Sequence, residues 1–180
     1  MSAGTDTGGI VKAVRSRVLR AAAAGTVATV TMDMAMTAAA AASPAAFSSD
    51  LLGIDVIGRW AEGLLHGRWR TTDAPGERAG RRHAALGMVT HYATGIVLAE
   101  TYRIGLRATR RSSSLQSATA YGLATAGLPL LILYPSLGYG CLGLQSGEAP
   151  RLLRIMLIGH AAFGLGIGIA LMCLEGPTDP

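Results

Sequence analysis

Four long apolar stretches, separated by shorter polar ones, dominate the pattern of the chain. A membrane-spanning helix needs roughly 20 mostly apolar residues, and each stretch reaches that length. The pattern therefore predicts an all-α fold, a four-transmembrane-helix bundle over residues 21–174, with a basic cytoplasmic segment at 1–20 and a short tail at 175–180. The expected spans are about Ala21 to Ala42, Ala84 to Leu106, Leu115 to Pro135 and Leu152 to Leu174.

The loop between the first two stretches contains a shorter amphipathic pattern. Leu52, Val56, Trp60 and Leu64 recur every four residues, and Ser49 or Asp50 precedes them as a possible N-cap. We expect a helix over about 50–66 that lies in the membrane interface and is anchored by Trp60. Trp60, Arg68 and Arg70 are either interfacial anchors or a rim that holds a substrate's phosphate or head group.

Composition agrees with a membrane protein. Half of the residues are hydrophobic and only 15% are charged, whereas a soluble domain carries about 25% charge. The 24 glycines suit helices whose backbones approach closely in lipid. Cys141 and Cys173 form no CxxC pair, so neither a zinc site nor a redox dithiol is indicated.

The net charge of +5 comes mainly from arginines beside the apolar stretches. That placement is typical of membrane topology and argues against nucleic acid as a partner. It favours a multi-pass membrane protein with both termini in the cytoplasm. A signal peptide is the alternative reading of the first stretch, but that stretch is long for a signal core and contains Asp33.

Three polar residues interrupt the apolar stretches at nearly one depth. Counting about 1.5 Å per helical residue puts Asp33, His91 and His160 about 18, 22 and 21 Å from the cytoplasmic side. Ionisable groups at bilayer depth indicate a functional site by default. Glu100 falls on the face opposite His91, so we expect it to pair with Arg103 or Arg107 instead.

The roles open to this cluster differ in chemistry. The three residues can simply bond the helices together. Two histidines and one carboxylate also match a facial-triad iron site, although no HxxH or ExxH spacing supports a metal or any other cofactor. In the catalytic reading, the apolar surroundings keep Asp33 protonated, so that it serves as a general acid while His91 or His160 accepts a proton.

Several short motifs resemble an uncharacterised bacterial family of small four-helix integral membrane proteins, classed as a domain of unknown function. The motifs are GTVATVTMDMAM around Asp33, IGRW, HGRWR, THYATGI around His91, LYPSLGYG and GHAAFGLGIG around His160. The resemblance covers roughly residues 20–174 and implies a four-span bundle of the bacterial plasma (inner) membrane, without an assigned activity. A fainter resemblance, carried by no diagnostic motif, is to small bacterial integral-membrane terpene cyclases.

These observations favour a membrane-embedded enzyme that protonates and then isomerises or cyclises a hydrophobic, isoprenoid-like substrate. Tyr92, Tyr102 and Tyr134 offer aromatic faces to a cationic intermediate. A proton-coupled transporter is one alternative, since Pro129 and Pro135 either break or kink the third span. The other is a non-catalytic module that packs with membrane lipids, a partner or a second copy through Gly164 and Gly168.

Overall fold

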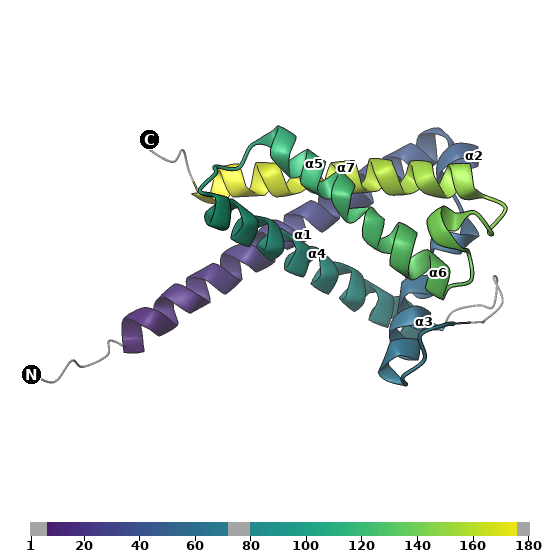
Figure 1. Ribbon diagram of the computed structural model, residues 1–180, viewed down its shortest axis with the longest axis horizontal. Coiled ribbons are helices and arrows are strands. Elements are labelled where there is room, and N and C mark those ends of the chain that lie inside the picture. The colour runs from purple at the N-terminus through teal and green to yellow at the C-terminus, as the bar shows by residue number, and fades with distance from the viewer. Residues whose placement is uncertain (1–6, 72–79, 176–180) are drawn as a thin grey trace, which may run out of the picture.

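The computed structural model describes residues 7–71 and 80–175, in which every regular element is a helix. The all-α prediction is therefore confirmed for these residues. Three long helices, α1 (Thr7–Ala42), α4 (Arg81–Thr109) and α7 (Ala149–Glu175), contain 36, 29 and 27 residues. A fourth rod consists of α5 (Leu115–Thr125), the π turn η2 (Pro129–Leu133) and α6 (Tyr134–Ser136), as Figure 1 shows. The shorter elements are α2 (Pro44–Phe47), η1 (Asp50–Leu52), α3 (Ile54–Leu65) and η3 (Cys141–Gly143).

Small residues bring antiparallel helices into backbone contact. A Cβ on Gly166 of α7 would lie 2.7 Å from Cα of Ala28 in α1. A Cβ on Gly164 of α7 would lie 2.7 Å from Cα of Thr119 in α5. Real Cβ atoms do not approach so closely, so both positions require glycine for the observed packing. Gly164 therefore allows α7 to approach α5 within this chain.

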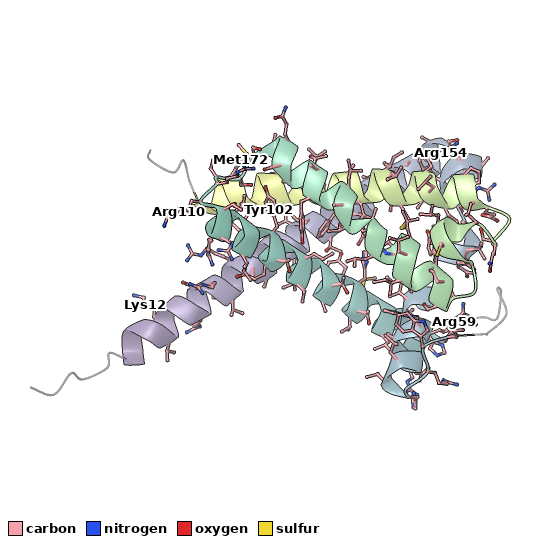
Figure 2. The ribbon with its side chains drawn as sticks, viewed as in Figure 1. Lys12, Arg59, Tyr102, Arg110, Arg154 and Met172 are labelled. Atoms are coloured by element: carbon pink, nitrogen blue, oxygen red, sulfur yellow. The ribbon has the colours of Figure 1, made fainter. Side chains whose placement is uncertain are left out.

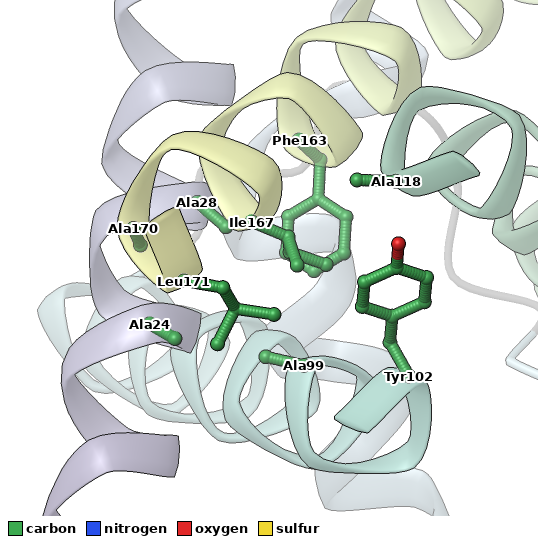
Figure 3. Packing of buried hydrophobic residues seen from close by; sticks show 9 residues of the cluster. All are labelled: Ala24, Ala28, Ala99, Tyr102, Ala118, Phe163, Ile167, Ala170 and Leu171. Carbon is green, nitrogen blue, oxygen red and sulfur yellow. The ribbon is translucent and has the colours of Figure 1, made fainter. Parts of the chain in front are cut away.

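The centre of the bundle is filled by alanines on α1, α4 and α5, by Tyr102 of α4, and by three large apolar side chains on α7. Figure 3 shows the side chains of Phe163, Ile167 and Leu171 pointing from α7 toward the other helices. Such interdigitation gains many weak dispersion contacts, because close packing leaves few voids. The cluster comprises Ala24, Ala28, Ala99, Tyr102, Ala118, Phe163, Ile167, Ala170 and Leu171.

Two segments of the described chain are long and apolar enough to cross a membrane. They are Leu115–Ser136 and Ala149–Leu174, which correspond to the third and fourth predicted spans. The helices α1 and α4 have sufficient length but are more polar, since α1 contains Asp33 and α4 contains His91 and Glu100. By length and composition, the structure thus supports membrane association through two of the four predicted spans.

The predicted break in the third span is a widened turn rather than an opening. The amide of Leu130 donates to the Ala126 carbonyl at 3.2 Å, and the amide of Tyr134 donates to the Pro129 carbonyl. The helix therefore passes through Pro129 with its backbone groups bonded. A π turn of this kind accommodates one extra residue and is frequent at functional sites.

The first loop differs from its prediction in two respects. Its helix is split at Gly53 into η1 and α3, and Ser49 caps η1 by accepting a hydrogen bond from the Leu51 amide at 3.2 Å. In addition, α3 has a neighbour in the chain that the sequence did not predict, while its position at a membrane interface stays a prediction. The helix packs against the start of α4, where a Cβ on Gly87 would overlap the Ile54 carbonyl. The loop helix is therefore part of the bundle.

Candidate functional site

Asp33 receives two hydrogen bonds across the contact between α1 and α4. His91 Nε2 lies 3.0 Å from Asp33 Oδ1, and the Tyr92 hydroxyl donates to Oδ2 at 3.1 Å. His91 and Tyr92 are consecutive, so their side chains leave α4 about 100° apart and reach the two oxygens from different sides. The predicted proximity of Asp33 and His91 is confirmed, and Tyr92 completes the arrangement.

The carboxylate is held firmly but remains accessible. The Asp33 side chain is 42% exposed, whereas that of His91 is 16% exposed. Met34, the next residue on α1, is an apolar side chain that is also exposed. A substrate can therefore reach Asp33 from the flank of the helix pair without entering the packed centre of the bundle.

The two hydrogen bonds to Asp33 show which proton can be transferred to a substrate. Tyr92 supplies its only hydroxyl proton to Oδ2, so the proton that can be transferred is the one between Asp33 Oδ1 and His91 Nε2. Either partner can hold that proton, and the pair can therefore release it to a substrate or accept one back. Chemically, the arrangement is suited to proton transfer.

His160 lies on α7 and bonds to α5 instead of joining Asp33. Its Nδ1 is 2.9 Å from the Thr125 hydroxyl oxygen. Gly159, next to His160, faces Met32 and Met36 of α1, which flank Asp33 in sequence. His160 is thus at the predicted level, but the direct three-residue cluster is not formed.

The hydrogen bonds of Thr125 determine which His160 nitrogen carries the proton. The Thr125 hydroxyl donates its single proton to the Gly122 carbonyl at 2.6 Å. It must then accept from His160 Nδ1, which makes Nδ1 the protonated nitrogen of the neutral ring. His160 Nε2 is left with a lone pair that can accept a hydrogen bond or a proton.

The facial-triad alternative is not assembled in the structure. Within residues 7–71 and 80–175, no group of three His, Cys, Asp or Glu side chains is placed to hold a metal ion. Asp33 and His91 are in contact, but His160 is directed to Thr125. The residue types that suggested the triad are present, but His160 uses Nδ1 to bond to Thr125 and makes no direct contact with Asp33 in the described structure.

The other predicted tyrosines are located away from Asp33. The Tyr102 hydroxyl bonds to Ser117 at 2.7 Å near the connection between α4 and α5, and its ring packs on Tyr121 with centroids 5.0 Å apart. Tyr134 is fully buried beside Tyr139. Its hydroxyl has no hydrogen-bond partner in the part of the chain that the structure describes. Of the three tyrosines, only Tyr92 contacts the carboxylate.

The predicted rim residues are on α3 and in the segment that follows it. Trp60 is half-buried on α3, and Arg68 and Arg70 are exposed beyond its end. In Figure 2, the adjacent Arg59 marks the end of the molecule at which α3 lies. None of the three rim residues contacts Asp33, so a role for them in binding substrate stays a prediction.

Glu100 behaves as expected from its position. Its Oε2 accepts a hydrogen bond from Arg103 at 2.7 Å, and its Oε1 is 4.0 Å from Arg107. Arg103 is buried, which makes this pair a structural ion pair of α4. The sequence-based separation of Glu100 from the Asp33 cluster is confirmed.

A second pairing of a carboxylate with a histidine was not predicted. Glu62 of α3 lies 2.7 Å from His83 Nε2 and 3.0 Å from Arg82, both at the start of α4. The hydrogen bond from His83 lowers the pKa of Glu62, and the charge of Arg82 acts in the same direction, against the opposing effect of burial. The only sequence signal was Glu62 itself, an acid inside an otherwise apolar helical pattern.

Comparisons with known proteins identify a family but no activity. No curated protein and no solved structure matches the chain. The fainter resemblance to terpene cyclases therefore has no support among them. Residues 22–173 match the family described as Protein of unknown function (DUF2938). The match includes Asp33, His91, Tyr92 and His160 and extends over most of the sequence, so this chain belongs to the DUF2938 family.

Proposed function

We propose that the chain crosses a membrane four times, through α1, α4, the α5–α6 rod and α7. The antiparallel order of these helices fits successive crossings. Large apolar side chains also point outward along the whole bundle, which is expected where the surroundings are lipid. Those more than half exposed include Met34, Val89, Val97, Ile104, Leu131 and Met172.

The orientation of the proposed spans follows from the distribution of arginines. Lys12 and Arg110 lie at one end of the molecule, whereas Arg59 and Arg154 lie at the other, as Figure 2 shows. The first end contains the basic start of α1 and the short connection between α4 and α5. Basic residues in short segments next to spans determine orientation under the positive-inside rule. This end is assigned to the cytoplasm.

Within this membrane domain, the proposed activity is proton transfer to a hydrophobic, isoprenoid-like substrate. A single observation carries the proposal: an accessible carboxylate at the level of the predicted bilayer centre, bonded to His91 and Tyr92. A purely structural polar contact would be expected to bury its carboxylate between the helices. Asp33 instead opens to the flank, where a lipid-soluble molecule would arrive.

The proposed reaction begins with the proton shared by Asp33 and His91. This proton adds to one carbon of an alkene, which leaves a carbocation on the neighbouring carbon, or to the oxygen of an epoxide, whose C–O bond then breaks to give a hydroxyl group and a carbocation. The cation rearranges or closes a ring, and a neighbouring C–H bond then loses a proton to the Asp33–His91 pair or to His160 Nε2. When the substrate is an alkene and the cation gives its proton to the Asp33–His91 pair, the protein returns to its starting state. Tyr92 keeps Oδ2 occupied, so that Oδ1 is the oxygen that exchanges the proton.

Lipid profiling tests this proposal directly. Cells would express the wild-type protein, Asp33→Asn or Glu62→Gln at equal membrane levels, and their extracted lipids would be compared by mass spectrometry. Glu62→Gln is the matched control, because it neutralises another histidine-bonded carboxylate outside the proposed site. We expect an isomerised or cyclised species that is formed with the wild type and the control and is lost with Asp33→Asn.

The result that would overturn the proposal is a product that forms equally with Asp33→Asn. The same would hold if all three folded proteins left a supplied isoprenoid alkene or epoxide mixture unchanged in reconstituted membranes. The membrane topology is tested separately, by the accessibility of single cysteines placed in the connections between helices.

A further inference from the structure

The first 14 residues of α1, Thr7 to Arg20, extend beyond the rest of the bundle. Figure 1 shows this part of α1 leaving the other helices at an oblique angle. Among the described side chains of α1, Ala21 is the first that is buried, whereas Val18 and Leu19 are each 60% exposed and Val11 is 67% exposed. We call residues 7–20 the arm. It is a regular helix that the described bundle does not cover.

The arm separates charge from apolar surface. Val11 and Val18 are seven positions apart, so they lie on nearly the same face of the helix, two turns from each other. Arg15 and Arg17 flank that face at about 60° and 100° on opposite sides. Lys12 and Arg20 lie farther from that face, at about 120° and 160° from Val18. All four basic side chains are exposed. The arm is thus an apolar ridge between cations.

The charge of the arm is of one sign. Residues 7–20 contain four basic residues and no acidic one. The α4–α5 connection at the same end adds Arg110 and Arg111, both exposed. Two arms from two copies would repel each other, which disfavours self-association. A nucleic acid would use the cations but would gain nothing from exposed valines set between them.

We infer that the arm is a docking surface for the anionic head groups of the membrane leaflet from which α1 emerges. An amphipathic basic helix binds such a surface by burying its apolar face at the acyl boundary while its cations contact phosphates. Arginine stems reach past apolar side chains to keep the guanidinium in the head-group layer. The inference uses the proposed membrane location of α1 but is independent of the chemistry at Asp33.

The path of α1 makes this contact geometrically reasonable. Residues 21–42 span about 33 Å as a helix, close to the roughly 30 Å of a hydrocarbon core. Val18 and Leu19 then emerge within one turn of the core edge. Because α1 is oblique to α7 in Figure 1, the arm rises from the surface less steeply than a perpendicular helix would.

The test uses the full chain in nanodiscs with an environment-sensitive dye on a single cysteine. Cys141 and Cys173, both free and exposed, would first be replaced by serine. The dye would be attached at Val18→Cys and, in a second preparation, at Val11→Cys. Nanodiscs of phosphatidylcholine alone would be compared with nanodiscs that also contain phosphatidylglycerol.

We expect blue-shifted emission and protection from an aqueous quencher only in the anionic discs. Raising the salt to 1 M, where the Debye length is about 3 Å, should reduce both effects. Neutralising the arm with Arg15→Gln, Arg17→Gln and Arg20→Gln should abolish them, while Arg151→Gln with Arg154→Gln at the opposite end should not.

Equal emission and quenching in the two lipid compositions would overturn the inference. A dye that is protected only when an acidic protein is added would also overturn it, since the arm would then serve a protein partner. The comparison of lipids uses a protein with its arginines intact, so it decides the question even if the neutralised variant does not fold.

Discussion

Asp33 of α1 and His91 of α4 are 58 positions apart in the chain, yet Asp33 Oδ1 and His91 Nε2 lie 3.0 Å apart. The contact joins two helices that also approach closely at Gly25 of α1 and Gly95 of α4. It therefore has two separable consequences, one for the stability of the bundle and one for proton transfer. The first can be measured without knowing any substrate.

A double-mutant cycle should show that Asp33 and His91 stabilise the bundle together. We expect Asp33→Ala and His91→Ala to have non-additive effects on the free energy of unfolding, with a coupling of about 1 kcal/mol, as is usual for polar contacts between membrane helices. The measurement is unfolding of the two single variants and the double variant in mixed micelles. Strictly additive effects would mean that the two side chains are not in contact in the membrane.

The contact between α3 and α4 should depend on Gly87. A Cβ there would overlap the Ile54 carbonyl, so Gly87→Ala should separate the helices and destabilise the protein by about 1–3 kcal/mol. Gly105→Ala is the matched control on the same helix, because no atom lies within 4 Å of its Cβ position. The control should lose no stability and can gain up to about 1 kcal/mol.

Tryptophan fluorescence is the appropriate readout for this pair of variants. The chain has only two tryptophans, Trp60 within α3 and Trp69 shortly after it, so their emission reports on that region alone. We expect red-shifted emission for Gly87→Ala and wild-type emission for Gly105→Ala. Equal behaviour of the two variants would show that the backbone contact at Gly87 is not required.

The same contact should weaken in acid because of Glu62. The hydrogen bond from His83 and the charge of Arg82 lower the pKa of Glu62 from its ordinary value of 4.5, with a smaller effect from His66. A carboxyl with a lowered pKa in the folded state stabilises that state above its ordinary pKa. The stabilisation is lost as the pH falls below 4.5 through the folded-state value.

The pH dependence is measured by thermal unfolding followed by tryptophan emission at neutral pH and at several values below 4.5. Wild type should lose more stability over this range than Glu62→Gln, which cannot ionise. The two proteins should therefore differ most at neutral pH and converge in acid. A constant difference between them at all pH values would exclude ionised Glu62 as the stabilising group.

Much of the helix arrangement could be predicted from the sequence. It follows from the lengths of the apolar stretches and from the positions of the polar residues along them. Apolar stretches of sufficient length located the long helices to within a few residues, apart from the start of α1. Short connections required antiparallel neighbours, and counting residues from one end placed Asp33 and His91 at one level. Their contact then needed only that both faces turn inward, which the periodicity of the helix allowed.

The remainder depended on small residues, which give no periodic signal. Gly58 and Gly87 allow α3 to pack closely on α4, a contact that the apolar pattern of α3 did not predict. The close approach at Gly122 and Gly164 sets the rotation of α7, which brings His160 Nδ1 to Thr125. The arm was missed for a different reason, because its basic residues interrupt the apolar stretch without interrupting the helix.

The position of the His160 proton is a further property that the geometry determines. Thr125 has one hydroxyl proton and donates it to the Gly122 carbonyl, so His160 must donate from Nδ1. This assignment decides whether Nε2 is a donor or an acceptor. It matters for the proposed reaction, because only an Nε2 lone pair can accept a proton from a substrate.

Nitrogen-15 solid-state NMR of the reconstituted protein should therefore show His160 as the Nδ1-protonated tautomer at neutral pH. Thr125→Val removes the acceptor and should shift the ring toward the Nε2-protonated form, whereas Thr125→Ser should preserve the wild-type spectrum because it keeps the hydroxyl. His83 in the same spectra is an internal control, since it bonds to Glu62 and should not respond to either substitution. A wild-type spectrum of the Nε2-protonated tautomer would mean that Thr125 donates to His160, and Nε2 would then be unable to act as the base.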